Sequence, residues 1–201
     1  MLVATKVLRR PRSDNRLPEL LDAAARLFAL HGYAGTSMRD IAEEAKMLAG
    51  SVYYHFASKD DLLLAVYAAG VQALEATAIS AMVGKTDPWQ RLEALCCAHL
   101  ETVLRDSDYA QVLIRVLPDD IPRIADRLRE LRANHERHFH TAIAALPLPP
   151  GTDRPSLRLM LLGSLNWAPF WFNPQGRDTP SALARKFVGL IKEKQDGETS
   201  T

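Results

Sequence analysis

The sequence predicts an all-α protein in two parts, and three observations lead to that fold class. Apolar residues recur at helical spacing in segment after segment, as at Met38, Ile41 and Ala45. Residues that favour helix starts precede many of these segments, and proline or glycine often follows them. No segment alternates between apolar and polar residues as a half-buried strand does. We expect the two parts to divide near Ser58.

The first helix is expected from Arg16 to Leu30. One face of it collects apolar side chains, namely Leu20, Leu21, Ala24, Leu27 and Phe28. Pro18 falls in the first turn, where a helix tolerates a residue without an N–H group. Gly32 follows His31 and is a common helix stop.

Residues 36–62 have the pattern of a helix-turn-helix. Thr36 and Ser37 are both good N-caps, and Asp40 is placed to complete a capping-box-like start with Ser37. Residues 46–48 interrupt the apolar pattern, so a second short helix is expected from about Ala49. Its apolar face holds Val52, Tyr53 and Phe56. A compact three-helix head at the N-terminus follows from these elements.

A longer helical region is expected from residue 59 to residue 195. Ser58 precedes three charged residues at a helix start, and Asp87-Pro88 has the pattern of an N-cap followed by a proline at the first helical position. Residues 147–155 are rich in proline and form a clear break. The helices expected in this region are 59–82, 88–105, 108–117, 121–146, 156–172 and 180–194. A polar tail, 196–201, ends the chain.

The residues of the head resemble the TetR/AcrR family of one-component transcription regulators. The resemblance covers roughly Leu17 to Leu63 and involves many positions at fixed spacing. They are Phe28, Gly32-Tyr33, Thr36-Ser37, Arg39-Asp40-Ile41-Ala42, Ala45, Gly50, Val52-Tyr53-Tyr54-His55-Phe56, Ser58-Lys59 and Leu62. Two positions depart from the pattern. Lys46 stands where the family usually has glycine, and Leu48 stands where it has a small capping residue, so Leu48 has no side-chain oxygen to cap the next helix.

The resemblance implies a DNA-binding domain over residues 16–58. The helix Ala49–Tyr54 would lie in the major groove, with Gly50 and Ser51 allowing close approach. Arg39 would reach a base edge, because a guanidinium suits guanine O6 and N7. The full set of candidate DNA-binding residues is Thr36, Ser37, Arg39, Ala49, Gly50, Ser51, Tyr53, Tyr54, His55 and Lys59. Of these, Ser37, Tyr53, His55 and Lys59 are candidates for phosphate contacts.

Several of these residues also have a structural explanation. Tyr53 and Phe56 could belong to the core of the head, and His55 could pack against the first helix. Arg39 could be a solvated surface charge. The basic arm over residues 1–15 could lie along phosphates or in a minor groove, or it could be a solvated tail.

The segment Leu157–Gly176 is too apolar for a helix with a solvated face. Together, Leu157–Phe172 and Pro180–Lys194 resemble the helix pair through which TetR/AcrR proteins form homodimers. A branch of the family that responds to acyl-CoA or lipid-catabolic intermediates is also similar, at Gly163, Leu165-Asn166-Trp167, Trp171-Phe172, Pro174 and Gly176. Asn166 and Trp167 are therefore candidate ligand-binding residues, with packing in a dimer interface as the alternative.

Charge is unevenly distributed along the chain. Residues 1–59 hold nine Lys and Arg against six Asp and Glu, whereas residues 60–201 hold sixteen against eighteen. The positive excess therefore lies in the part that contains the helix-turn-helix.

Motif content argues against other classes of protein. We found no catalytic motif, no cofactor-binding loop and no metal-ligand spacing, and a metal site at His135 and His138 is the less favoured explanation of those histidines. Adjacent Cys96 and Cys97 favour reduced thiols in the cytoplasm. No apolar run approaches the ~20 residues of a membrane span, so no membrane partner is expected.

The sequence thus indicates a cytoplasmic homodimeric transcription regulator without enzymatic activity. It would be a repressor that a small molecule releases from a near-palindromic double-stranded DNA operator. The expected effector is a bulky apolar compound or an acyl-CoA, bound in a ligand-binding and dimerisation domain over residues 59–195. The alternatives are a helical carrier or scaffold with a non-functional helix-turn-helix, and a TetR-like activator without small-molecule input.

Overall fold

The computed structural model describes residues 16–105 and 107–196, and within them the chain is helical and has no β-strand. The predicted all-α class is confirmed. The expected arm and most of the expected tail lie outside the described residues. In chain order the elements are α1 (Leu17–His31), α2 (Met38–Glu44), α3 (Ala49–His55), α4 (Lys59–Met82), α5 (Pro88–Val103), α6 (Asp108–Arg115), the 3₁₀ turns η1 (Pro118–Asp120) and η2 (Pro122–Ile124), α7 (Ala125–Ala144), α8 (Arg154–Trp171) and α9 (Pro180–Asp196).

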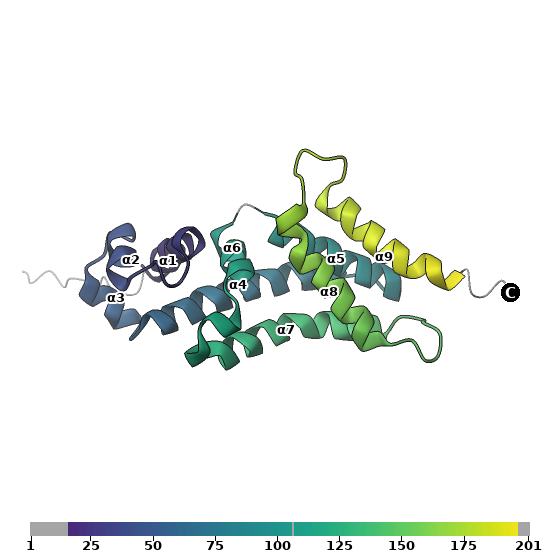
Figure 1. Ribbon diagram of the computed structural model, residues 1–201, viewed down its shortest axis with the longest axis horizontal. Coiled ribbons are helices and arrows are strands. Elements are labelled where there is room, and N and C mark those ends of the chain that lie inside the picture. Colours follow the sequence, from purple (N-terminus) through teal and green to yellow (C-terminus); the bar gives the residue numbers. More distant parts are fainter. Residues whose placement is uncertain (1–15, 106, 197–201) are drawn as a thin grey trace, which may run out of the picture.

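The molecule is elongated, with a three-helix head at one end (Figure 1). Helices α1, α2 and α3 form this head, and α4 leaves it to run along the body. Helix α6 packs against both α1 and α4, while α9 packs chiefly against α5. The body therefore meets the head through α4 and α6.

The core of the head does not end at Ser58. Phe28 of α1 and Ile41 of α2 belong to the same apolar cluster as Val66 of α4 and Val112 of α6. The cluster continues into the beginning of α7 at Leu128. The division that we expected near Ser58 is therefore not a break in the packing.

A left-handed backbone joins α2 to α3. Lys46 has a φ of 52°, the one positive φ among the described non-glycine residues, as the comparison with glycine at this position predicted. Ser37 and Asp40 form the predicted capping box at the start of α2, and Leu48 precedes α3 without a side-chain cap. The guanidinium of Arg16 donates to the carbonyl oxygens of Ala45, at 2.7 Å, and of Lys46, at 3.2 Å. Arg16 thus stabilises the turn between α2 and α3, which contains the two departures from the family pattern, Lys46 and Leu48.

The helix expected over residues 121–146 begins later than predicted, because two 3₁₀ turns that start with proline precede it. The apolar spacing predicted a helix from Ile121, but α7 begins at Ala125. Pro118 and Pro122 each begin a 3₁₀ turn, and a proline restricts the residue before it to a non-helical conformation. Ile121 lies between the two turns and is buried.

Helix α4 corrects a second expectation. By length and composition alone it is apolar enough to cross a membrane, so the statement that no apolar run approaches that length is wrong. Its apolar character has an explanation in the packing. Leu62 and Val66 lie in the core of the head, while Ala78 lies in a second core between α5, α7, α8 and α9. A helix that enters two cores needs apolar residues on more than one face.

We expect Arg16→Ala to destabilise the protein by about 1–2 kcal/mol, because two carbonyl oxygens at the α2–α3 turn lose a charged donor. Arg26→Ala is the matched control, since Arg26 is a largely exposed α1 residue that pairs with Glu44 of α2. The control should change stability by less than about 0.5 kcal/mol. Urea unfolding followed by circular dichroism measures both, and equal midpoints for the two variants would contradict the role given to Arg16.

Candidate nucleic-acid interface and helical pocket

Helix α3 presents an exposed face at the end of the head. Val52 is fully buried and anchors the helix, while Tyr53 and Tyr54 are 55% and 76% exposed. At its N-terminus Ala49 and Gly50 are exposed and carry little side chain, and Ser51 is half-buried. This face therefore combines room for close approach with two phenolic hydroxyls. Tyr53 is not a core residue, which decides one of the alternatives left open by the sequence.

Arg39, on the neighbouring helix α2, has an unengaged guanidinium. The side chain is exposed, and it makes no hydrogen bond or ion pair with any residue that the structure describes. Ser37 is also exposed, at the N-cap of α2. Half-buried His55 ends α3, and its ring meets that of Tyr54 edge-on.

Two of the candidate DNA-binding residues also have internal roles. Thr36 is buried, and its hydroxyl lies within hydrogen-bonding distance of the carbonyl oxygens of Leu27 and Gly32. The Lys59 ammonium donates to the carbonyl oxygens of Tyr33 and Thr36, both at 2.8 Å, and lies 4.1 Å from the centre of the Tyr33 ring. These contacts hold the segment that leads into α2, and they leave Lys59 one N–H for a phosphate.

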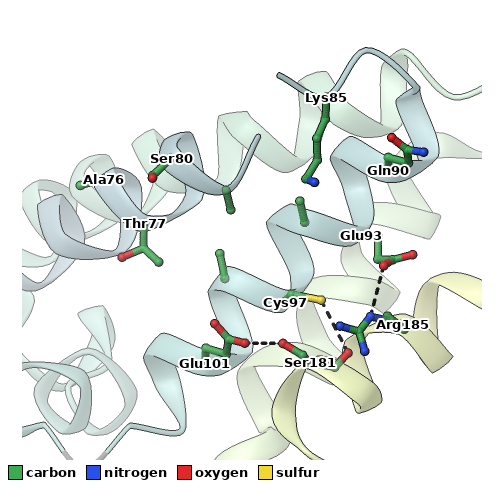
Figure 2. A pocket seen from close by; sticks show the side chains of 13 residues that line it. Ala76, Thr77, Ser80, Lys85, Gln90, Glu93, Cys97, Glu101, Ser181 and Arg185 are labelled. Carbon is green, nitrogen blue, oxygen red and sulfur yellow. Dashed lines mark hydrogen bonds and ion pairs between the residues drawn. The ribbon is translucent and has the colours of Figure 1, made fainter. Parts of the chain in front are cut away.

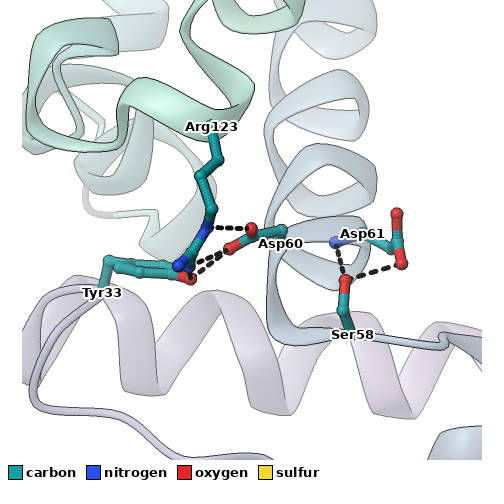
Figure 3. Close-up of polar contacts among 5 residues, drawn as sticks. All are labelled: Tyr33, Ser58, Asp60, Asp61 and Arg123. Atoms are coloured by element: carbon teal, nitrogen blue, oxygen red, sulfur yellow. Dashed lines mark hydrogen bonds and ion pairs between the residues drawn. The ribbon is translucent and has the colours of Figure 1, made fainter.

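Tyr33, Asp60 and Arg123 connect the head to the body (Figure 3). The Tyr33 hydroxyl donates to Asp60, and Arg123 of η2 donates to Asp60 at 3.0 Å and to the Tyr33 oxygen at 3.2 Å. Hydrogen bonds from Arg123 and Tyr33 lower the pKa of Asp60, so its carboxylate stays charged. Three elements distant in the sequence therefore share one polar contact.

A cavity of about 630 Å³ lies in the body between α4, α5, α6, α7 and α8. Most of its wall is apolar. The lining residues are Tyr67, Val71, Leu74, His99, Val103, Leu113, Ile114, Arg115, Leu117, Arg132, His135, Glu136, Leu162, Gly163, Asn166, Trp167 and Phe170. We call this cavity the central pocket. Its composition suits a bulky apolar ligand with a few polar groups.

Three polar side chains form a hydrogen-bonded chain in the wall of the central pocket. His99 Nδ1 lies 3.0 Å from His135 Nε2, and His99 Nε2 lies 3.1 Å from Asn166 Oδ1. Both histidines are buried, and burial lowers the pKa of His99 to about 4 and that of His135 to about 3. Both rings are consequently neutral at pH 7.

The central pocket also touches the head through an arginine. Arg115, at the end of α6, lines the pocket and donates to the carbonyl oxygen of Ala29 in α1 at 2.7 Å. Arg132 of α7 donates to the Tyr67 hydroxyl and to the Leu113 carbonyl oxygen, both at 3.0 Å. A ligand in the pocket would therefore lie against side chains that fix α6 to its neighbours.

The structure brings both candidate ligand-binding residues to the central pocket. Asn166 and Trp167 line it, although Trp167 is also 61% exposed and stacks on Phe170. Trp167 therefore belongs both to the pocket wall and to the outer surface, so a ligand-binding role does not exclude a place in a dimer interface. The sequence interpretation missed His99. Its signal was a polar residue on the apolar face of α5, three residues after Cys96 and seven after Leu92.

A second cavity, of about 980 Å³, lies between α4, α5 and α9 (Figure 2). It is more polar than the central pocket, and several of its charged groups already have partners. Arg185 pairs with Glu93 at 3.3 Å, and the Ser181 hydroxyl donates to Glu101. The half-buried Cys97 thiol faces the Ser181 carbonyl oxygen. Within the described part of the chain, no three His, Cys, Asp or Glu side chains are grouped to hold a metal ion.

Comparison with known families agrees with this architecture. Residues 20–66 match the family described as bacterial regulatory proteins, tetR family, and residues 85–193 match the tetracyclin repressor-like C-terminal domain. The chain belongs to the TetR family. Members of this family are bacterial regulators, and the head and body of the chain each match one of its two domains.

Three relatives illustrate the similarity. The HTH-type transcriptional repressor KstR2 of Mycobacterium tuberculosis is 28% identical over 187 residues, which are 89% of this chain and 92% of KstR2. The HTH-type transcriptional activator FasR of Mycolicibacterium smegmatis is 28% identical over 82% of this chain and 75% of its own. The crystal structure of AibR in complex with isovaleryl coenzyme A and operator DNA has a TM-score of 0.74 and 25% identity, covering 88% of this chain and 97% of AibR.

We expect Arg39→Ala to relax the preference for particular base pairs of the operator by about 1–3 kcal/mol, because a free guanidinium suits a guanine edge. Thermal stability should not change, since Arg39 has no partner among the described residues. Binding to a panel of single-base operator variants measures the preference. Arg127→Ala, on the exposed face of α7, is the control. An equal loss of affinity on every sequence would contradict base reading by Arg39.

The buried histidine pair should make stability sensitive to acid. Unfolded histidines take up protons below a pKa of about 6.5, but His99 and His135 resist protonation in the folded protein until pH 4 or below. The free energy of unfolding should therefore fall as the pH drops below 6.5, with a slope of up to about 1.4 kcal/mol per pH unit for each histidine.

Urea unfolding between pH 7.5 and 4.5 tests this expectation. The double variant His99→Leu/His135→Phe should show a shallower slope than the unsubstituted protein. His140→Gln, at an exposed position of the same helix α7, should keep the original slope. If the double variant kept the original slope as well, the pair would not be the cause of the acid sensitivity.

Proposed function

We propose that the protein is a ligand-released transcriptional repressor that acts in the cytoplasm and is not an enzyme. The observation that carries this proposal is the connection between its two sites. The exposed face of α3 and the free guanidinium of Arg39 suit DNA, and the central pocket suits an apolar ligand. Arg115 belongs to the pocket wall and is hydrogen-bonded to the head. Among the relatives, KstR2 is a named repressor.

DNA binding would use two copies of the chain. Large apolar side chains remain exposed on α8 and α9, namely Leu159, Met160, Trp167, Phe170, Trp171 and Leu190. Such a surface is typical of a protein interface. A two-fold dimer through these helices would carry two heads, and a separation of about 34–36 Å would let them read a near-palindromic operator in successive major grooves.

The effector would be a bulky apolar compound or an acyl-CoA. The apolar wall of the central pocket supports an acyl chain or a compact ring system, and the AibR structure contains isovaleryl coenzyme A together with operator DNA. Release of DNA requires the effector to bind more tightly to the conformation in which the heads are wrongly spaced. Contacts between the effector and Arg115 would provide this difference in affinity. Arg115 belongs to α6, and α6 packs against α1 of the head.

An activator is the second candidate, since FasR is a named activator with similar identity. The two candidates share the operator, the dimer and the helix-turn-helix. They differ in what bound protein does to transcription. A promoter–reporter fusion with and without the gene separates them, because loss of a repressor raises expression and loss of an activator lowers it.

Fluorescence anisotropy on the DNA upstream of the protein's own gene tests the proposal, at about 150 mM salt with excess unrelated DNA. We expect saturable binding that resists the competitor, and dissociation when a saturating apolar acyl-CoA is added. Coenzyme A alone is the control for the effector. Binding that the competitor abolishes, or release by small polar molecules only, would contradict the proposal.

A further inference from the structure

The carboxamide of Asn166 is held in a fixed orientation at the edge of the central pocket. Asn166 is exposed on α8, yet its Oδ1 lies 3.1 Å from Nε2 of the buried His99. His99 in turn contacts His135 at 3.0 Å and packs edge-on against Phe139. A pocket residue that points its oxygen inward, at a ring fixed by other side chains, has little freedom to rotate.

The positions of the protons in this chain follow from its hydrogen bonds. An amide oxygen only accepts, so His99 Nε2 carries the proton of the first bond. A neutral imidazole has one N–H, so His99 Nδ1 accepts, and His135 Nε2 is the donor to it. The remaining ring nitrogen, His135 Nδ1, is an acceptor. It is buried and has no partner among the described residues.

The opposite placement of the protons along these hydrogen bonds is less favourable. If the Asn166 amide were turned around, its NH₂ group would donate to His99, and every proton of the chain would move to the other nitrogen. His135 Nδ1 would then be a buried N–H without an acceptor. Unpaired buried donors are rarer in proteins than acceptors with unused capacity. We therefore assign Asn166 as the acceptor that ends the chain, with Oδ1 toward His99.

This assignment leaves the NH₂ group of Asn166 free at the pocket. The carboxamide is planar, so fixing Oδ1 toward His99 also fixes the direction of Nδ2. No described residue accepts a hydrogen bond from Nδ2. The pocket around it is lined by apolar side chains such as Leu162, Val103 and Trp167. An oriented donor among these apolar side chains favours a ligand with an acceptor at that point.

We infer that Asn166 binds the carbonyl oxygen of the effector, and that His99 and His135 are positioning residues that orient the Asn166 amide. The inference rests on the proposed function, because it takes the central pocket to be the effector site. It adds a chemical requirement to that function. The effector carries an uncharged carbonyl group, such as that of a thioester, an ester or a ketone, within its apolar part.

A neutral acceptor fits this position better than a carboxylate. The two histidines hydrogen-bonded behind Asn166 are neutral, so this group of side chains offers no positive charge to a buried anion. Three charged side chains also line the pocket, and each already has a hydrogen-bond partner. Arg115 donates to the carbonyl oxygen of Ala29. Arg132 donates to Tyr67 and Leu113, and Glu136 accepts from Arg158 at 3.2 Å.

Two CoA derivatives of equal chain length test the inference. One is a branched short-chain acyl-CoA, and the other is the S-alkyl-CoA thioether, which lacks only the carbonyl oxygen. Isothermal titration calorimetry gives the dissociation constant of each. We expect the thioester to bind about three- to tenfold more tightly, the usual effect of one neutral hydrogen bond. DNA release, followed by anisotropy, should show the same preference.

Variants identify the residues responsible. Asn166→Leu and the isosteric Asn166→Asp both remove the NH₂ donor. In both variants the ratio of the thioether to the thioester dissociation constant should be close to one. His99→Phe should lower the ratio of thioester to thioether affinity, because the Asn166 amide loses the ring that orients it. A merely structural role of His99 would weaken both ligands alike and keep the ratio. Trp167→Leu is the matched control, because it changes the pocket wall beside Asn166 without touching the chain. It should weaken both ligands and keep their ratio.

The outcomes separate the two proposals. Equal affinity of the two ligands for the unsubstituted protein would overturn the carbonyl inference and leave an apolar effector in place. A preference that survives in both Asn166 variants would overturn the role of Asn166. If neither ligand bound or released DNA, the acyl-CoA form of the proposed function would fail, and the inference that rests on it would fail with it.

Discussion

A single apolar core joins the DNA-facing head to the body, and the rest of the molecule depends on it. Phe28 and Ile41 of the head share this core with Val66 of α4 and Val112 of α6. Close-packed interiors deform little, so a shift of α6 must be accommodated by the helices around it. The central pocket touches the same helix at Arg115. The head and the pocket are therefore parts of one packed unit.

Polar contacts at the edge of this core hold the helix-turn-helix in shape. Lys46 adopts a left-handed conformation without being glycine, and Leu48 leaves α3 without a side-chain cap. Arg16 and Lys59 offset these features by donating to carbonyl oxygens on either side of α2. Cationic side chains that look like phosphate ligands in the sequence thus have a second role inside the protein. Arg39, by contrast, is exposed on α2 and has no hydrogen-bond or ion-pair partner among the described residues.

The central pocket combines an apolar wall with one neutral polar chain. Burial of His99 and His135 keeps them uncharged, and Asn166 connects them to the pocket surface. A neutral chain costs less to bury than an ion pair and still fixes a direction for hydrogen bonding. With Asn166 in the proposed role, the pocket would discriminate between ligands of similar size by one polar atom, which an apolar wall alone does poorly.

The sequence by itself determined the helices, the capping box at Ser37 and the strained position of Lys46, because each depends on neighbours a few residues away. It also carried the family resemblance, since that lies in fixed spacings along the chain. Only the tertiary structure decided that Lys59 binds carbonyl oxygens, that α4 serves two cores, and that His99 meets His135 and Asn166. His135 and Asn166 lie 36 and 67 positions from His99 along the sequence. Contacts at such separations depend on how helices pack, and local periodicity contains no information about them.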